Sequence, residues 1–169
     1  MQRRDFFVGA LVVPLFHEAP ARALGVRPRR LDFPADFGAH PDTRTEWWYV
    51  TGELAAGAQR YGFQVTFFRS RTAVPPEHPS RFAAQQLVFA HAALADVQSR
   101  ELRHDQRLAR AGFGVAEATE GDTDVRLRDW SLRRRGPLDA TRYEALVSSD
   151  SARFALRLGL DAPQPLLLQ

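Results

Sequence analysis

With 169 residues and 44% hydrophobic side chains, the chain is long enough to form one globular domain with its own core. The formal net charge is +3, but all 23 basic residues are arginine and 20 acidic residues are interspersed among them. A nucleic-acid site needs basic side chains clustered on one face, so this pattern argues against a nucleic-acid partner. The absence of cysteine excludes disulfides, thiolate catalysis and sulfur-ligated metal sites.

The N-terminus has the features of a twin-arginine (Tat) signal peptide over residues 1–23. Arg3-Arg4 precedes a short apolar stretch at 8–16, and Ala21-Arg22-Ala23 offers a small-x-small cleavage site. We therefore expect a periplasmic or secreted protein. The apolar stretch is too short to cross about 30 Å of hydrocarbon, so an integral membrane protein is not expected. The alternative is an apolar N-terminal helix that is retained, which Pro14 disfavours.

An extended arm and a β-hairpin are predicted next. Residues 24–45 are rich in proline, arginine and aspartate and show no periodicity, which is typical of an extended segment. Residues 46–54 and 59–71 alternate with period two, and the short linker between them predicts a hairpin. The folded domain should span residues 46–169.

The first of these strands carries aromatic side chains on both faces. Trp47 and Tyr49 share one face, whereas Glu46, Trp48 and Val50 share the other. Large rings on both sides favour a strand that packs on one face and lines a cavity with the other. The alternative is that the tryptophan pair only plugs the end of a small barrel.

Further strands are predicted along the rest of the chain. Residues 72–81 contain three prolines and should form a surface loop. Residues 85–96 alternate, although an alanine-rich helix is the rival interpretation, and residues 100–114 could form a short helix or a connecting strand. Strands are also predicted at 124–133, 142–148 and 153–161. The fold class is therefore all-β: an antiparallel lipocalin-like β-barrel or a strongly curled sheet, which need not be complete.

Five short blocks carry a family resemblance. They are His40-Pro41, Glu46-Trp47-Trp48-Tyr49, Gly62-Phe63-Gln64, Phe67-Phe68-Arg69 and Ala90-His91-Ala92-Ala93-Leu94-Ala95-Asp96. In this order they resemble the N-terminal half of the carotenoid 1,2-hydratase and AttH-like family, many of whose members are called predicted secreted hydrolases. The resemblance runs from about Asp32 to Gln169. It implies two lipocalin-like domains, of which this chain carries the first and lacks the second, its expected partner.

The resemblance implies an exported hydratase-like or hydrolase-like protein that acts on a long apolar substrate of isoprenoid or lipid type. The alternative is a lipocalin-like module that binds or carries an apolar ligand without chemistry. The candidate ligand-binding residues are Trp47, Trp48, Tyr49, Gln64, Phe68 and Arg69. The three rings of the first strand also offer electron-rich faces to a carbocation.

Four side chains are candidate catalytic residues. Hydration of a carbon–carbon double bond needs an acid, and Glu46 or Asp96 could serve if an apolar wall raises its pKa. His40 and His91 could orient the attacking water. The competing interpretations are structural: a core histidine at 91, a turn cap at Asp96 and an ion pair from Glu46 to Arg44 or Arg69.

Other chemistries have little support in the sequence. The serines lack the Gly-x-Ser-x-Gly turn of a nucleophile elbow. The five histidines show no metal-ligand spacing, and there is no glycine-rich phosphate loop. We therefore expect neither a metal nor a cofactor.

Overall fold

A computed structural model describes residues 29–163 and contains nine β-strands with two single-turn 3-10 helices. The signal peptide predicted at residues 1–23 lies outside the described residues. No helix in the described part is long and apolar enough to span a membrane. The strands are β1 (Thr45–Ala56), β2 (Gln59–Arg71), β3 (Gln86–Asp96), β4 (Glu101–Arg110), β5 (Ala116–Ala118), β6 (Asp124–Leu127), β7 (Trp130–Arg135), β8 (Thr141–Ser149) and β9 (Phe154–Ala162).

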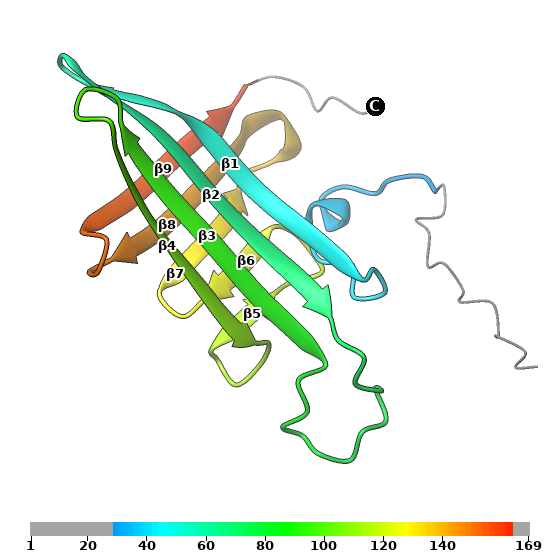
Figure 1. Cartoon of the computed structure of the whole chain (residues 1–169). Helices are drawn as coiled ribbons and strands as arrows, with labels where there is room; N and C mark the ends of the chain where they lie inside the picture. Colours follow the sequence, from blue (N-terminus) through cyan, green and yellow to red (C-terminus); the bar gives the residue numbers. More distant parts are fainter. Residues whose placement is uncertain (1–28, 164–169) are drawn as a thin grey trace, which may run out of the picture.

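The strands form two antiparallel sheets in which every neighbour in space is also the neighbour in sequence. Sheet A has the order β1-β2-β3-β4, and sheet B has the order β5-β6-β7-β8-β9. The two sheets lie face to face with their strands crossing (Figure 1). The all-β, antiparallel prediction is confirmed. Among residues 29–163 no strand pairing joins the two sheets, so they do not close into a barrel.

The hydrophobic core fills the space between the two inner faces. Alternation with period two sends Phe63, Val65 and Phe67 of β2 inward, and sheet B contributes the fully buried Trp130. Apolar burial of this kind is the main stabilising contribution, about 25 cal/mol for each Å² removed from water. The core residues are Phe63, Val65, Phe67, Val88, Ala90, Ala92, Ala116, Val125, Leu127, Trp130, Leu132, Ala145, Val147, Phe154, Leu156 and Leu158.

Two segments that the sequence left open are strands. Residues 86–96 form β3, so the alanine-rich helix is wrong for this segment. The polar segment 101–110 forms β4, at the edge of sheet A. An edge strand tolerates polar side chains on both faces, which is why β4 lacks clear alternation. Of its inner-face residues, Arg107 places its guanidinium carbon 4.5 Å from the centre of the Trp130 ring.

The segment before β1 ties the two sheets together. The carbonyl oxygen of Phe37 accepts hydrogen bonds from Trp48 Nε1 of sheet A and from Thr123 Oγ1 at the edge of sheet B, both at 2.9 Å. The Ala39 N–H donates to the Thr119 carbonyl oxygen at 2.7 Å. Gly38 lies so close to this loop that a Cβ would overlap the Glu120 carbonyl. The arm therefore closes one end of the space between the sheets.

Candidate functional site

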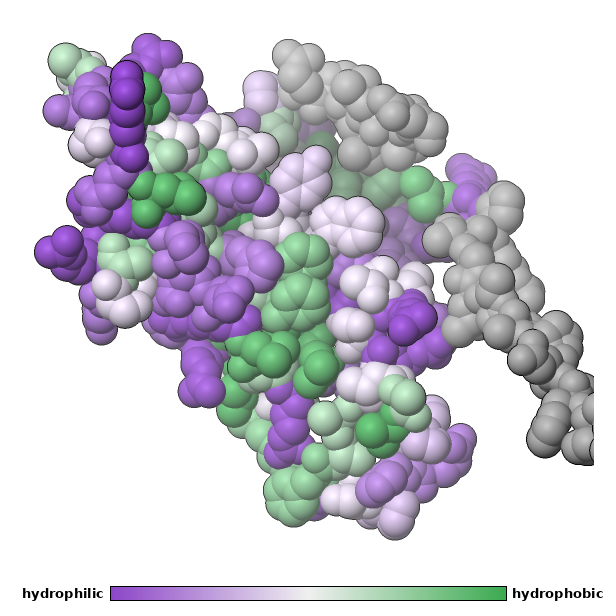
Figure 2. Space-filling model, in the orientation of Figure 1, coloured by the Kyte–Doolittle hydropathy of each residue, from purple (hydrophilic) through white to green (hydrophobic). Residues whose placement is uncertain are grey.

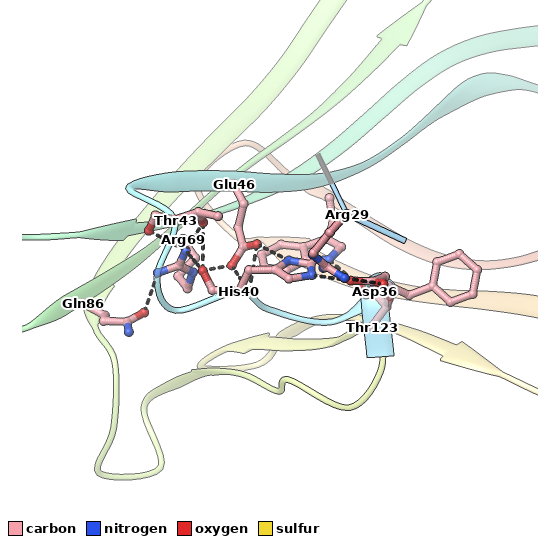
Figure 3. A network of polar contacts seen from close by, with 10 residues as sticks. Arg29, Asp36, His40, Thr43, Glu46, Arg69, Gln86 and Thr123 are labelled. Atoms are coloured by element: carbon pink, nitrogen blue, oxygen red, sulfur yellow. Dashed lines mark hydrogen bonds and ion pairs between the residues drawn. The ribbon is translucent and has the colours of Figure 1, made fainter. Parts of the chain in front are cut away.

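The most buried charged group is the guanidinium of Arg69 on β2, whose side chain is 2% exposed. It pairs through Nε with Glu46 of β1 and donates from Nη1 to Gln86 Oε1 of β3 at 2.9 Å. Nη2 donates to the carbonyl oxygens of His40 and Thr43 and to the Thr43 hydroxyl at 2.6–3.0 Å. Figure 3 shows this cluster, which we call the arm network, below the end of β1. Burial is tolerated because a partner faces each guanidinium nitrogen.

The arm network continues through His40 to Asp36. His40 Nδ1 lies 3.0 Å from Glu46 Oε2, and its Nε2 lies 3.0 Å from Asp36 Oδ1. Burial alone would lower the pKa of His40, but hydrogen bonds to the two carboxylates outweigh it and raise the pKa above its ordinary value. The Arg29 guanidinium, the Asp32 N–H and the His40 ring hold the pKa of Asp36 well below its usual range. The two carboxylates thus favour the protonated form of His40.

A pocket of about 360 Å³ opens beside the arm network, between the edges of the two sheets. Arg69 and Gln86 line it on the polar side, and Val88 and Ala116 on the apolar side. Phe113 lies at its margin. None of the three tryptophans lines this pocket, so the lined cavity expected behind the Trp48 face is not found there. Trp48 instead packs against the core.

The outer face of sheet A is apolar and open to solvent in the described structure. The strand register places Trp47, Phe68, Phe89 and Leu108 side by side in one row across all four strands. Trp47 is 60% exposed, Tyr49 61% and Leu108 61%. We call this row and its neighbour Tyr49 the aromatic face. Figure 2 shows an apolar strip running over this side of the molecule.

The rings of the aromatic face form a flat surface. Phe68 and Phe89 stack with ring centres 4.5 Å apart and planes 7° from parallel, and His91 packs beside Phe68 with ring centres 5.5 Å apart. Four cross-strand rows of outward side chains begin on β1, at positions 45, 47, 49 and 51. These rows contain no carboxylate and a single guanidinium, that of Arg110. Antiparallel sheets usually present polar side chains on their solvated face. An apolar patch in that position marks a binding surface.

The structure separates the predicted catalytic residues into three places. His40 and Glu46 are in contact. Glu46 also pairs with Arg69, which is one of the two ion-pair partners suggested by the sequence. Asp96 is at the opposite end of sheet A, since it pairs across β2 with Leu54, roughly 27 Å along the strand from Glu46. His91 is exposed on the aromatic face and is therefore not a core histidine.

Asp96 does not have the raised pKa that a proton donor would need. Its carboxylate accepts the backbone N–H groups of Ser99 and Gln98 at 3.0 Å, which lowers its pKa. The raised pKa expected for this residue is wrong, because the strand end offers donors instead of an apolar wall. The turn-cap interpretation matches these hydrogen bonds.

The predicted ligand-binding residues also divide between two faces. Trp47, Tyr49, Gln64 and Phe68 all point outward from sheet A, whereas Trp48 and Arg69 point inward. Sequence reasoning missed Asp36, Phe89 and Leu108. Phe89 could have been found, since it alternates in phase with His91 on β3. Asp36 had no such signal, because it lies in a non-periodic segment.

Comparison with known proteins identifies the family. The sequence profile described as AttH-like matches residues 25–169. A crystal structure of a candidate AttH protein from Nitrosomonas europaea matches with 44% sequence identity and a TM-score of 0.71. The match covers 86% of this chain and 42% of that one, so the chain spans less than half the length of this relative. No curated protein matches the chain.

We predict that Glu46→Gln strongly destabilises the fold. The substitution keeps the shape but removes the charge opposite Arg69, and an uncompensated buried charge costs about 3–5 kcal/mol. The matched control is Glu53→Gln on the same strand, whose partner Arg60 and own side chain are each more than half exposed. That exposed pair should contribute less than about 1 kcal/mol. Urea unfolding of both variants measures the difference, and equal losses would contradict the prediction.

We also predict that His40 makes stability depend on pH. Its pKa is raised in the folded state, so its contribution is complete below the unfolded value of about 6.5 and is lost as the pH rises through the folded value. The urea midpoint of the unaltered chain should therefore fall across this window relative to that of His40→Gln. His104→Gln, at an exposed position on β4, serves as the control and should follow the unaltered chain. If the urea midpoints of all three proteins change with pH in the same way, His40 is not the source of the pH dependence.

Proposed function

The chain belongs to the AttH-like family, and we propose that it binds a long apolar molecule on the aromatic face of sheet A. The observation that carries the proposal is the uncharged row Trp47, Phe68, Phe89 and Leu108, which spans every strand of the sheet. Three of the six ligand-binding residues suggested by the sequence belong to this face, and a fourth, Gln64, points to the same side of the sheet. The bound molecule is either a substrate or a cargo.

The dimensions of the aromatic face fit an extended chain. Neighbouring strands are about 4.8 Å apart, so a row of four side chains offers a track of roughly 14 Å or more. The stacked rings of Phe68 and Phe89 form the middle of the track, and Trp47 and Leu108 form its two ends. Aromatic rings bury large apolar areas at a small cost in side-chain entropy. A flat hydrocarbon or polyene is the shape that covers such a track.

A variant pair on adjacent positions of β1 tests the proposal. Trp47→Ala should weaken binding of dodecanol, followed by calorimetry, by at least about tenfold, because it removes one end of the exposed track. Its urea midpoint should stay near that of the unaltered chain. Trp48→Ala should lower the urea midpoint instead, since that ring packs against the core and donates to the Phe37 carbonyl.

Saturable binding by the unaltered chain that is at least about tenfold weaker in Trp47→Ala supports binding on the aromatic face. Dodecanol that gives no saturable response at any concentration below its solubility limit would rule the proposal out. If Trp47→Ala leaves the affinity for dodecanol unchanged, the ligand binds somewhere other than the aromatic face.

A hydratase or hydrolase role is our second proposal, supported by His40. The His40 ring lies between Asp36 and Glu46, which favour its protonated form, and its chain neighbours Ala39 and Pro41 both line the pocket. A positioned histidine can pass a proton to a reacting group. The three donors already on the Glu46 carboxylate favour an orienting role for that residue over proton donation.

Turnover assays of p-nitrophenyl decanoate, for ester hydrolysis, and squalene, for alkene hydration, test this second role. If the chain turns over either compound, His40→Gln should lower the rate by about 100-fold or more. Asp96→Asn, far from the pocket, should leave the rate unchanged. A rate that His40→Gln does not alter would exclude His40 from the chemistry, and the absence of turnover of both compounds would leave the chain a binding module.

A further inference from the structure

We infer that the apolar molecule carries an anionic group at one end, and that Arg81 and Arg110 bind this group at the corner of sheet A. The inference rests on the proposed function, because it assigns the chemical class of the molecule that the aromatic face takes. The ligand class is a long-chain anionic amphiphile, such as a fatty carboxylate.

The corner is built from two aromatic rings and two guanidinium groups. Phe82, in the loop between β2 and β3, stacks on Phe113, in the loop between β4 and β5, with ring centres 5.5 Å apart and planes 12° from parallel. Arg110 places its guanidinium carbon 4.1 Å from the Phe113 ring centre, and Arg81 lies 5.6 Å from each ring. We call this group the arginine corner. The stacked rings hold two positive charges near one point.

Neither charge of the arginine corner is neutralised by the described protein. Among residues 29–163 no carboxylate forms an ion pair with Arg81 or Arg110, whereas ion pairs occupy Arg69, Arg107 and Arg134 in the rest of the structure. Arg110 uses Nη1 to donate to the Phe82 carbonyl oxygen at 2.8 Å, which fixes the side chain and leaves other donors available. Two guanidinium groups held without a counter-ion form a site for an anion.

The adjacent pocket has two acidic lining residues, Glu117 and Glu120, and among residues 29–163 neither forms an ion pair with Arg81 or Arg110. The Glu117 carboxylate instead accepts from Arg126 Nη2 at 2.6 Å. The arginine corner therefore keeps both positive charges.

The aromatic face leads directly to the arginine corner. Arg110 follows Leu108 by two positions on β4, so it points to the same side of the sheet, roughly 7 Å further along the strand. Leu108 is itself the end of the row that begins at Trp47. An extended chain on the aromatic row therefore brings its end group to the two guanidinium groups. A neutral end group would leave them without a partner.

Binding of three probes to the unaltered chain tests the inference: dodecanoate, dodecanol and acetate, each below any micelle-forming concentration and followed by calorimetry. We expect dodecanoate to bind about tenfold more tightly than dodecanol, and acetate not to bind measurably, because the chain and the charge act together. Arg81→Gln should weaken dodecanoate by a similar factor and leave dodecanol unchanged. Arg81 makes no hydrogen bond or ion pair among the described residues, so this variant should keep the fold.

Arg157→Gln is the matched control, since it removes one exposed arginine from β9 of the other sheet and changes the net charge equally. Arg110→Gln provides a second test at the same corner. Equal affinity for dodecanoate and dodecanol, unaffected by either corner substitution, would overturn the anionic class while leaving the apolar site intact. Failure of both long probes to bind would overturn the proposed function itself. If Trp47 becomes shielded from solvent when only the protein concentration is raised, a second copy of the chain covers the aromatic face. That result would also overturn the inference.

Discussion

The burial of one guanidinium group determines how this end of the molecule is built. Arginine is always charged in a protein, so a buried guanidinium needs a partner for each of its nitrogens. With 2% of the side chain exposed, water cannot supply the missing partners, and the chain itself must do so. Two of those partners are main-chain carbonyls of the arm, at His40 and Thr43. The course of the arm and the position of Glu46 are therefore tied to the partners that Arg69 needs, and Glu46 is in turn one of the two carboxylates beside His40.

Sheet A carries large apolar side chains on both sides, and the two sides have different consequences. The inner side packs on sheet B and stabilises the fold, whereas the outer side contributes little to stability while it faces water. A protein retains such a surface when something covers it during function. The crossing of the two sheets leaves the inner space filled with side chains and capped by the arm. The binding surface that we propose therefore lies on the outside of the sheet, in contrast to that of a lipocalin, which binds within its barrel.

Period-two alternation was sufficient to predict most of the strands, because each has one buried and one exposed face. Alternation failed to predict β4, because both faces of this strand carry polar side chains. On the inner face, the aliphatic stems of arginine side chains cover the edge of the core, although arginine counts as a polar residue in the sequence pattern. Alternation also assigned Trp47 and Trp48 to opposite faces of β1. It could not say which face was inward, because that depends on Phe37 and Thr123, which lie elsewhere in the chain. The pairing of Glu46 with Arg69 was one of two options and required the register of β1 and β2 to decide it.

The hydrogen bond from Thr123 to Phe37 joins residues 86 positions apart, whereas every strand pairs with its neighbour in sequence. Contacts between neighbours close short loops and form early, but a contact over this distance must wait until the intervening chain is ordered. The arm precedes both sheets in the chain, yet its contacts with Thr119 and Thr123 cannot form until sheet B is ordered. Before that, the Phe37 carbonyl oxygen has only the Trp48 donor. Complete docking of the arm therefore requires both sheets, although the partners of Arg69 all come from the arm and sheet A.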